Sequence, residues 1–142
     1  MSADIATSVK PLLCVVDDDS LLRDSTSRLL RSYGFRVKAF GSGEEFWISG
    51  RLEEIACLIL DVRMPGMSGV ELQSKLLASH TEIPVVFITA YEDEGLRAQA
   101  LRQGIRALLI KPFSDDALLN AINQALIKKS PEERGDTKKE AS

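Results

Sequence analysis

Acidic residues follow two apolar, strand-like segments of this chain, at the point where each segment gives way to a loop. Asp61 closes one segment and leads directly into a loop that contains proline and glycine. The triplet Asp17-Asp18-Asp19 follows a second segment, Leu12–Val16. Because the carboxyl ends of parallel strands meet at one edge of a sheet, these carboxylates can converge on one spot. Magnesium binds carboxylate oxygens and aspartate can act as a nucleophile, so the pattern predicts a magnesium site beside a nucleophilic Asp61.

Two further polar residues, Thr89 and Lys111, end later strand-like segments and would complete such a site. A lysine offers a compact positive charge to phosphoryl oxygens, and a threonine hydroxyl can donate a hydrogen bond to one of them. Such an array stabilises the charge on a phosphoryl group during its transfer. Asp61 is the residue best placed to attack, because it leads into an exposed turn.

Each of these residues also has an ordinary structural interpretation when it is considered alone. Asp19 could be the N-cap of a helix, Thr89 a threonine at a strand end, and Lys111 a solvated lysine before a proline. Their combination at the ends of four of the five predicted strands favours the functional interpretation.

The composition is that of an ordinary globular protein with one domain. The 142 residues are 44% apolar and 27% charged, and the net charge of −3 comes from 18 basic and 21 acidic residues. The basic residues are scattered, which argues against nucleic-acid binding by this domain. No stretch is long and apolar enough to span a bilayer, and residues 1–10 lack the basic start and apolar run of a secretion signal. We therefore expect a cytoplasmic protein that does not bind membranes.

The chain divides into three parts by composition. We expect a flexible segment at residues 1–10, a folded domain at residues 11–127, and a disordered tail or linker stub at residues 128–142. In the last part Lys, Glu, Ser, Gly and Pro dominate, and no apolar periodicity remains.

The cysteines and the single histidine do not indicate a metal or redox site. Cys14 and Cys57 lie within apolar segments and lack the Cys-x-x-Cys spacing of a metal or redox pair. We interpret them as small buried hydrophobic residues. His80 lies in a polar stretch, and we expect it to be solvated.

Strand and helix patterns alternate through the predicted domain. Amphipathic patterns with capping residues predict helices at 20–33, 42–50, 68–79 and 94–103 and from Ser114 onwards. In the last helix, the expected buried stripe consists of Leu118, Leu119, Ile122 and Leu126. Apolar segments rich in β-branched residues predict strands at Leu12–Asp17, Phe35–Phe40, Ala56–Asp61, Ile83–Thr89 and Arg106–Ile110.

This order of elements predicts an α/β fold. Short connections and right-handed crossovers give a doubly wound parallel sheet with helices on both faces. Phe35–Phe40, in which charged and apolar residues alternate, is the expected edge strand.

Four short motifs carry the polar residues of the predicted site: Val-Val-Asp17-Asp18-Asp19, Leu-Asp61-Val-Arg-Met-Pro-Gly-Met-Ser-Gly69, Ile-Thr89-Ala and Lys111-Pro112-Phe113. Together they resemble the receiver domain of bacterial two-component response regulators, and the likeness runs from about Leu12 to Leu126. The resemblance implies a flavodoxin-like three-layer sandwich with five helices and a five-stranded sheet in the order 2-1-3-4-5. It also implies a phosphoprotein that takes part in phosphorelay signal transduction.

The resemblance assigns roles to the acidic residues. Asp61 would accept a phosphoryl group from a phosphohistidine of a sensor histidine kinase and become 4-aspartylphosphate. Asp18 and Asp61 would bind Mg²⁺ directly, and Asp17 would act mainly through water. The main-chain carbonyl of Arg63 would complete the protein ligands.

The resemblance also implies how the signal would leave the site. Thr89 and Lys111 would hold the phosphoryl oxygens, and the Lys111–Pro112 bond would be cis. In the family, the threonine hydroxyl moves toward the phosphoryl group. The face made by the fourth helix, fifth strand and fifth helix then changes by a population shift.

This chain departs from the family pattern at one position. Family members usually carry Tyr or Phe three residues before the lysine, and this chain has Leu108 there. Either the protein signals without this ring, or Tyr91 takes over part of its role. Arg63 and Tyr91 each lie two residues past a site residue, and we expect both side chains to screen the acyl phosphate from water and lengthen its lifetime.

The expected function is that of a signalling receiver that catalyses its own phosphorylation and dephosphorylation and turns over no external substrate. An aspartyl-phosphate phosphatase is the rival interpretation, but that class normally needs an acid/base aspartate where Arg63 stands. The expected partners are a sensor histidine kinase and either an output domain of a longer transcriptional regulator or a separate protein. A homodimer formed on phosphorylation is a further option.

Overall fold

Strands and helices alternate along the chain in the computed structural model, which describes residues 10–49, 51–91 and 93–127. The predicted tail at residues 128–142 and residues 1–9 of the predicted N-terminal segment lie outside this part. In chain order the elements are β1 (Leu12–Val16), α2 (Ser20–Ser32), β2 (Arg36–Phe40), α3 (Gly43–Ser49), the 3₁₀ helix η1 (Leu52–Glu54), β3 (Ile55–Asp61), α4 (Gly69–Ala78), β4 (Val85–Thr89), α5 (Glu94–Arg102), β5 (Ala107–Ile110) and α6 (Asp115–Leu126).

The five strands form one parallel sheet in the order β2-β1-β3-β4-β5, which confirms the predicted doubly wound topology. The strand order reverses between β1 and β3, and folds of this kind bind ligands at the carboxyl ends of the strands beside such a reversal. β2 lies at one edge of the sheet as predicted, and its Arg36 and Lys38 side chains are exposed.

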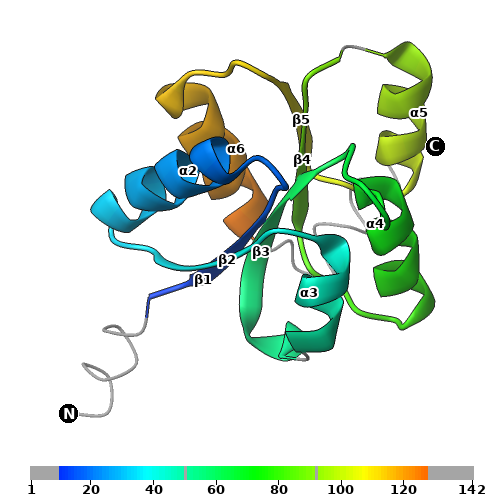
Figure 1. Ribbon diagram of the computed structural model, residues 1–142, viewed down its shortest axis with the longest axis horizontal. Helices are drawn as coiled ribbons and strands as arrows, with labels where there is room; N and C mark the ends of the chain where they lie inside the picture. The colour runs from blue at the N-terminus through cyan, green and yellow to red at the C-terminus, as the bar shows by residue number, and fades with distance from the viewer. Residues whose placement is uncertain (1–9, 50, 92, 128–142) are drawn as a thin grey trace, which may run out of the picture.

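Helices cover both faces of the sheet and make a three-layer sandwich (Figure 1). On one face, the α2 residue Leu30 and the α6 residue Leu118 pack against alternate strand residues such as Ile59. On the other, Phe46 of α3 and Leu72 of α4 pack against the residues between them. Both faces of the central strands are therefore buried, which explains why their sequences are apolar without alternation. No helix in the described part of the chain is long and apolar enough to cross a membrane.

The helix N-termini fix where each loop at the carboxyl edge ends. Asp19 is the N-cap of α2, and its carboxylate accepts hydrogen bonds from the N–H groups of Leu21 and Leu22. Ser68 and Glu71 form the predicted capping box at the start of α4, with distances of 3.1 Å and 2.8 Å. Each cap satisfies backbone donors that the helix itself leaves unpaired, so the loops before α2 and α4 end at defined residues.

Several details of the elements differ from the prediction. β4 begins at Val85 rather than Ile83, because Pro84 has no N–H for the ladder. The buried stripe of α6 consists of Leu118, Ala121, Ile122 and Ala125. Leu119 and Leu126, which were expected in that stripe, are only partly buried. The two alanines face the sheet instead.

The start of α3 also differs from the predicted capping box. Ser42 Oγ accepts the N–H of Glu45 as expected, at 3.0 Å. The Glu45 carboxylate, however, accepts the N–H of Gly41 at 2.9 Å rather than that of Ser42. The first turn of α3 is therefore closed by Ser42 and Glu45, and this leaves the neighbouring Glu44 for another contact.

Gly69 allows the loop after β3 to fold back on the strand end. Its N–H donates to the carbonyl of Val62 at 2.8 Å. A Cβ at this position would collide with the Asp61 carbonyl oxygen and would lie 2.9 Å from Val62 Cα. Only glycine permits this approach, so the sequence Ser68-Gly69 helps to set the position of Asp61.

Candidate functional site

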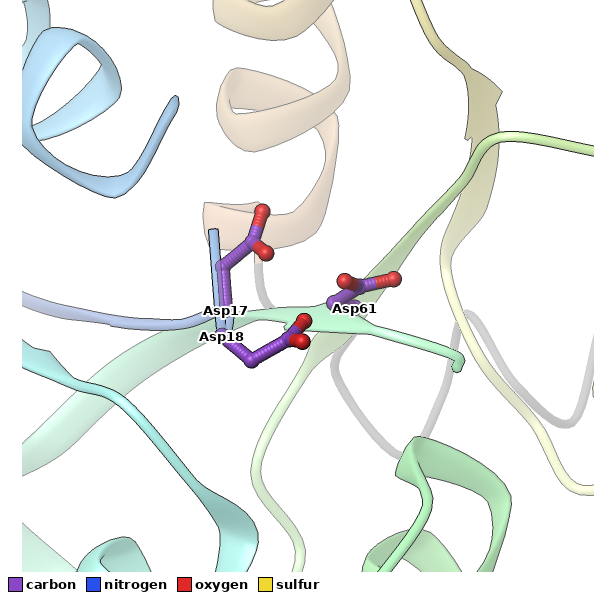
Figure 2. A group of neighbouring side chains, drawn as sticks. All are labelled: Asp17, Asp18 and Asp61. Carbon is purple, nitrogen blue, oxygen red and sulfur yellow. The ribbon is translucent and has the colours of Figure 1, made fainter. Parts of the chain in front are cut away.

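The carboxyl ends of β1 and β3 bring three acidic side chains together. Val16 pairs with Leu60 across these strands, so Asp17, Asp18 and Asp61 lie at neighbouring strand ends. Figure 2 shows the three side chains grouped at this edge of the sheet. One oxygen from each carboxylate lies within 4.8 Å of the others. The convergence predicted from the sequence is confirmed.

Lys111, which follows β5, reaches two of these carboxylates. Its Nζ atom lies 3.3 Å from Asp61 Oδ2 and 3.3 Å from Asp17 Oδ2. The first contact is a hydrogen bond, whereas the second is an ion pair without hydrogen-bond geometry, and Asp17 Oδ2 has no hydrogen-bond partner. Asp17 is fully buried and Asp61 is 4% exposed. Burial lowers the pKa of Lys111, but the two carboxylates outweigh this and raise it overall, so the lysine is charged.

Asp61 is a carboxyl group in an environment that disfavours its charge. Burial first, and then the neighbouring Asp17 carboxylate, raise the pKa of Asp61 to about 7, although Lys111 acts in the opposite direction. A divalent cation would favour the ionised form and would use the oxygen of Asp17 that lacks a hydrogen bond. Three carboxylates with these properties fit Mg²⁺, which prefers hard oxygen ligands.

Backbone groups hold the other carboxylate oxygens of the site. Asp17 Oδ1 accepts the N–H of Asp19 at 3.0 Å, and Asp61 Oδ1 accepts the N–H of Arg63 at 3.3 Å. Arg23 Nη1 donates to the carbonyl of Asp17 at 2.7 Å. Arg23 was missed from the sequence, where it reads as one of several solvated basic residues of the first helix. The one signal available in the sequence was that Arg23 lies one helical turn after the acidic triplet, close enough for its side chain to reach back to it.

Thr89 and Lys111 are joined through the backbone of two adjacent strands. The Lys111 N–H donates to the Thr89 carbonyl at 2.7 Å, and the Lys111–Pro112 bond is cis as predicted. Thr89 is fully buried, and its Oγ1 accepts the N–H of Tyr91 at 3.3 Å. Its hydroxyl hydrogen remains available for donation.

Arg63 and Tyr91, which the sequence places on different loops, lie against one another. The Arg63 guanidinium carbon is 5.1 Å from the centroid of the Tyr91 ring, a cation–π distance. Tyr91 is 61% exposed. Leu108 lies opposite Phe87 in the β4–β5 ladder and packs on the core rather than among the carboxylates.

Glu44 is a second residue that sequence reasoning missed. Its Oε2 atom accepts the N–H of Met67 at 3.0 Å, which links α3 to the loop after β3. The sequence placed Glu44 inside a capping pattern, so no local signal indicated a contact 23 residues away.

The cysteines are inert packing residues, as predicted. Both are free and buried. Burial raises the pKa of Cys14 to about 11 and that of Cys57 to about 12, so neither thiol ionises near neutral pH. His80 is exposed as expected, with a left-handed φ of 60°.

Comparison with known proteins identifies the family. Residues 13–123 match the model of the response regulator receiver domain. The chain therefore belongs to the response regulator receiver domain family. Receiver domains of response regulators are signalling proteins of two-component systems, and they bind Mg²⁺ at an acidic cluster like the one formed by Asp17, Asp18 and Asp61.

Curated relatives are similar to this chain over part of their length. Nodulation protein W of Bradyrhizobium diazoefficiens is 41% identical over 115 residues, which cover 81% of this chain and 51% of that protein. The response regulator protein TmoT of Ectopseudomonas mendocina is 39% identical, covering 87% and 56%. The transcriptional regulatory protein FixJ of B. diazoefficiens is 35% identical, covering 87% and 60%. The chain spans a little over half the length of these relatives.

Solved structures share the fold. The response regulator StyR is 44% identical with a TM-score of 0.79, and the match covers 94% of this chain and 67% of that one. A response regulator receiver protein from Burkholderia phymatum is 41% identical with a TM-score of 0.73, covering 86% and 99%.

The raised pKa of Asp61 predicts a specific pH dependence of stability in the absence of Mg²⁺. The folded carboxyl binds its proton more tightly than the unfolded one, so the free energy of unfolding falls as pH rises from about 4 to 7. Asn resembles the protonated carboxyl, so Asp61→Asn should stabilise the Mg²⁺-free protein at pH 8 by roughly 2–4 kcal/mol. At pH 5 the stabilisation should be smaller, roughly 1–2 kcal/mol, because the folded carboxyl is still protonated while the unfolded one is already mostly ionised.

Urea unfolding in EDTA at the two pH values measures this difference. Mg²⁺ should stabilise the wild type at pH 8 and should stabilise Asp61→Asn much less. An Asp61→Asn difference from the wild type that is equal at pH 5 and pH 8 would contradict the assignment.

Proposed function

We propose that this domain accepts a phosphoryl group on Asp61 in a Mg²⁺-dependent reaction and passes the signal to an output partner. The observation that carries this proposal is the placement of Lys111 Nζ at 3.3 Å from both Asp61 and Asp17, beside the exposed Asp18. This arrangement joins a nucleophilic carboxylate, a fixed cation and a site for a divalent ion. It is the set of groups that phosphoryl transfer to aspartate requires.

The proposed donor is a phosphohistidine of a sensor histidine kinase. A carboxylate oxygen of Asp61 attacks phosphorus and forms the new O–P bond. The P–N bond of the donor breaks, and its electron pair returns to the imidazole ring. Bound Mg²⁺ would be held by Asp17, Asp18, Asp61 and the Arg63 carbonyl, and would neutralise charge on the phosphoryl oxygens.

Lys111 and Thr89 have complementary roles in this proposal. Lys111 favours the ionised form of Asp61 and then pairs with a phosphoryl oxygen. Thr89 donates its hydroxyl hydrogen to another phosphoryl oxygen. The rival phosphatase chemistry would need an acid/base carboxylate at position 63, and the Arg63 guanidinium there stacks on Tyr91.

Incubation with acetyl phosphate and Mg²⁺ is expected to attach one phosphoryl group per chain, in an acid-stable and base-labile linkage. Asp61→Asn removes the nucleophilic oxygen and should abolish labelling, because an amide cannot form the acyl phosphate. Intact-mass spectrometry measures the stoichiometry. Labelling of Asp61→Asn to the wild-type extent, or multiple turnover of phosphate esters by the wild type, would contradict the proposal.

We further propose that Arg63 and Tyr91 shield the acyl phosphate as a pair. Arg63→Asn and Tyr91→Ala should each increase the rate of dephosphorylation about twofold to fivefold, as loss of an exposed cation–π contact worth ~0.5–1 kcal/mol predicts. The double variant should be little faster than either single one, because both remove the same contact. Loss of label measured over time tests this, and unchanged rates in both single variants would rule the shield out.

The proposed relay runs through the α5–β5–α6 face. Thr89 ends β4, and Lys111 follows β5 and precedes the cis proline. A phosphoryl group held by both residues would therefore act on two loops of this face. Only Ala100 is buried in α5. A helix with so little buried surface can shift at low cost. Because Leu108 stands where the family usually has an aromatic ring, the relay would depend on Thr89 and Tyr91.

Beryllofluoride, a phosphoryl mimic, should change backbone amide NMR shifts in α5 and β5. Residues in η1, at the opposite end of the strands, serve as the internal control and should move little. Thr89→Ala should suppress the α5 changes, since the hydroxyl is the proposed link. Unchanged α5 shifts in the wild type at saturating mimic would refute the relay.

The curated relatives indicate what the partners of this domain would be. They include a transcriptional regulatory protein and are longer than this chain, so we propose that the domain acts with an output domain or a separate regulator. The proposed setting is the cytoplasm. Comparing the molecular mass in solution before and after phosphorylation tests whether the signal also forms a homodimer.

A further inference from the structure

We infer that Glu44 is a positioning residue for the proposed phosphorylation site. Its carboxylate holds the β3–α4 loop, residues 62–68, in the form that presents Arg63 beside Asp61. The inference rests on the proposed function, because Arg63 matters as the proposed carbonyl ligand of Mg²⁺.

The β3–α4 loop is anchored at its ends but exposed in its middle. Next to Asp61, the Arg63 N–H bonds to the carboxylate at 3.3 Å. At the far end, the Ser68 cap and the bond from Gly69 N–H to Val62 fix the start of α4. Arg63, Pro65 and Gly66, by contrast, are exposed, so the tip needs a contact from outside the loop.

Glu44 supplies that contact from the first turn of α3. Its Oε2 accepts the N–H of Met67 at 3.0 Å. A Cβ at Gly66 would lie 2.6 Å from the same oxygen, and Gly66 has a left-handed φ of 74°. The side chain of Met67 lies against Gly43, where a Cβ would be 3.2 Å from its Sδ. Two glycines thus let the loop tip and the helix meet closely.

The Glu44 carboxylate is not needed to cap its own helix. Glu45 and Ser42 close the first turn of α3 with bonds of 2.9 Å and 3.0 Å. The bond from Glu44 to Met67 therefore adds nothing to the closure of α3 and restrains only the loop. One such hydrogen bond from outside the loop can decide the position of an exposed loop tip.

Loss of an outer partner of a metal site typically weakens metal binding by 10–100-fold. Glu44 acts through a loop rather than on a ligand side chain, so Glu44→Ala should weaken Mg²⁺ binding by about tenfold, the lower end of that range. The labelling rate at saturating Mg²⁺ should remain within about twofold of the wild type, because Asp61, Thr89 and Lys111 are unchanged.

The test compares Glu44→Ala with Glu44→Gln and with Glu53→Ala in the full chain. Gln keeps an oxygen that can accept the Met67 N–H but lacks the charge. Glu53, exposed on η1, controls for the loss of one negative charge. Isothermal titration gives the Mg²⁺ affinity, acetyl phosphate gives the labelling rate, and amide exchange of Met67 reports on the hydrogen bond. Urea unfolding checks that each variant is folded.

We expect Glu44→Ala to bind Mg²⁺ about tenfold more weakly and to exchange the Met67 amide faster, with Glu44→Gln close to the wild type and Glu53→Ala unchanged. Wild-type affinity in Glu44→Ala would overturn the inference. Equal weakening in the Ala and Gln variants would also overturn it, because charge alone would then explain the effect. If the wild type binds Mg²⁺ but is not labelled at Asp61, the proposed function fails, while the Mg²⁺ titrations still decide the role of Glu44.

Discussion

The ion pairing of Lys111 with Asp17 and Asp61 is the interaction on which the site depends. Two carboxylates at the buried end of a sheet repel one another and lose hydration, and a single lysine 3.3 Å from each only partly offsets this cost. The pKa of Asp61, raised to about 7, is the sign that the balance is incomplete. The site is therefore short of positive charge, which suits it to a divalent cation and then to a phosphoryl group held by that cation and the lysine.

The parallel sheet brings the carboxylates and Lys111 to one place. Asp17 and Lys111 are separated by most of the domain in sequence, yet β1, β3, β4 and β5 all end at the same edge. Helices on both faces bury the central strands, so their positions are set by the packing of Leu30, Leu118, Phe46 and Leu72 rather than by the polar residues. The cost of gathering like charges is thus offset by an apolar core that contains none of them.

The two loops beside the site differ in how firmly the surrounding structure holds them. The loop after β3 is restrained by a capping box, by the close approach at Gly69 and by Glu44. The loop after β4 leads into α5, where Ala100 is the only buried residue. The Arg63–Tyr91 contact joins the two loops. The loop after β3 is firmly held, which keeps the carboxylates in place. The helix α5 is loosely packed and can shift. The proposed phosphorylation switch requires both properties.

Local sequence patterns predicted the order of strands and helices and the candidate site residues Asp17, Asp18, Asp61, Thr89 and Lys111, and the family resemblance supplied the order of strands in the sheet. These depend on local signals: apolar runs, caps such as Asp19 and Ser68, and polar residues at strand ends. Four contacts became visible only in the folded domain: Arg23 binds the Asp17 carbonyl, Arg63 stacks on Tyr91, Glu44 holds Met67, and alanines of α6 face the sheet. Most of these contacts join residues on different elements, and in all four the distance and direction come from how the elements pack, which no local pattern records.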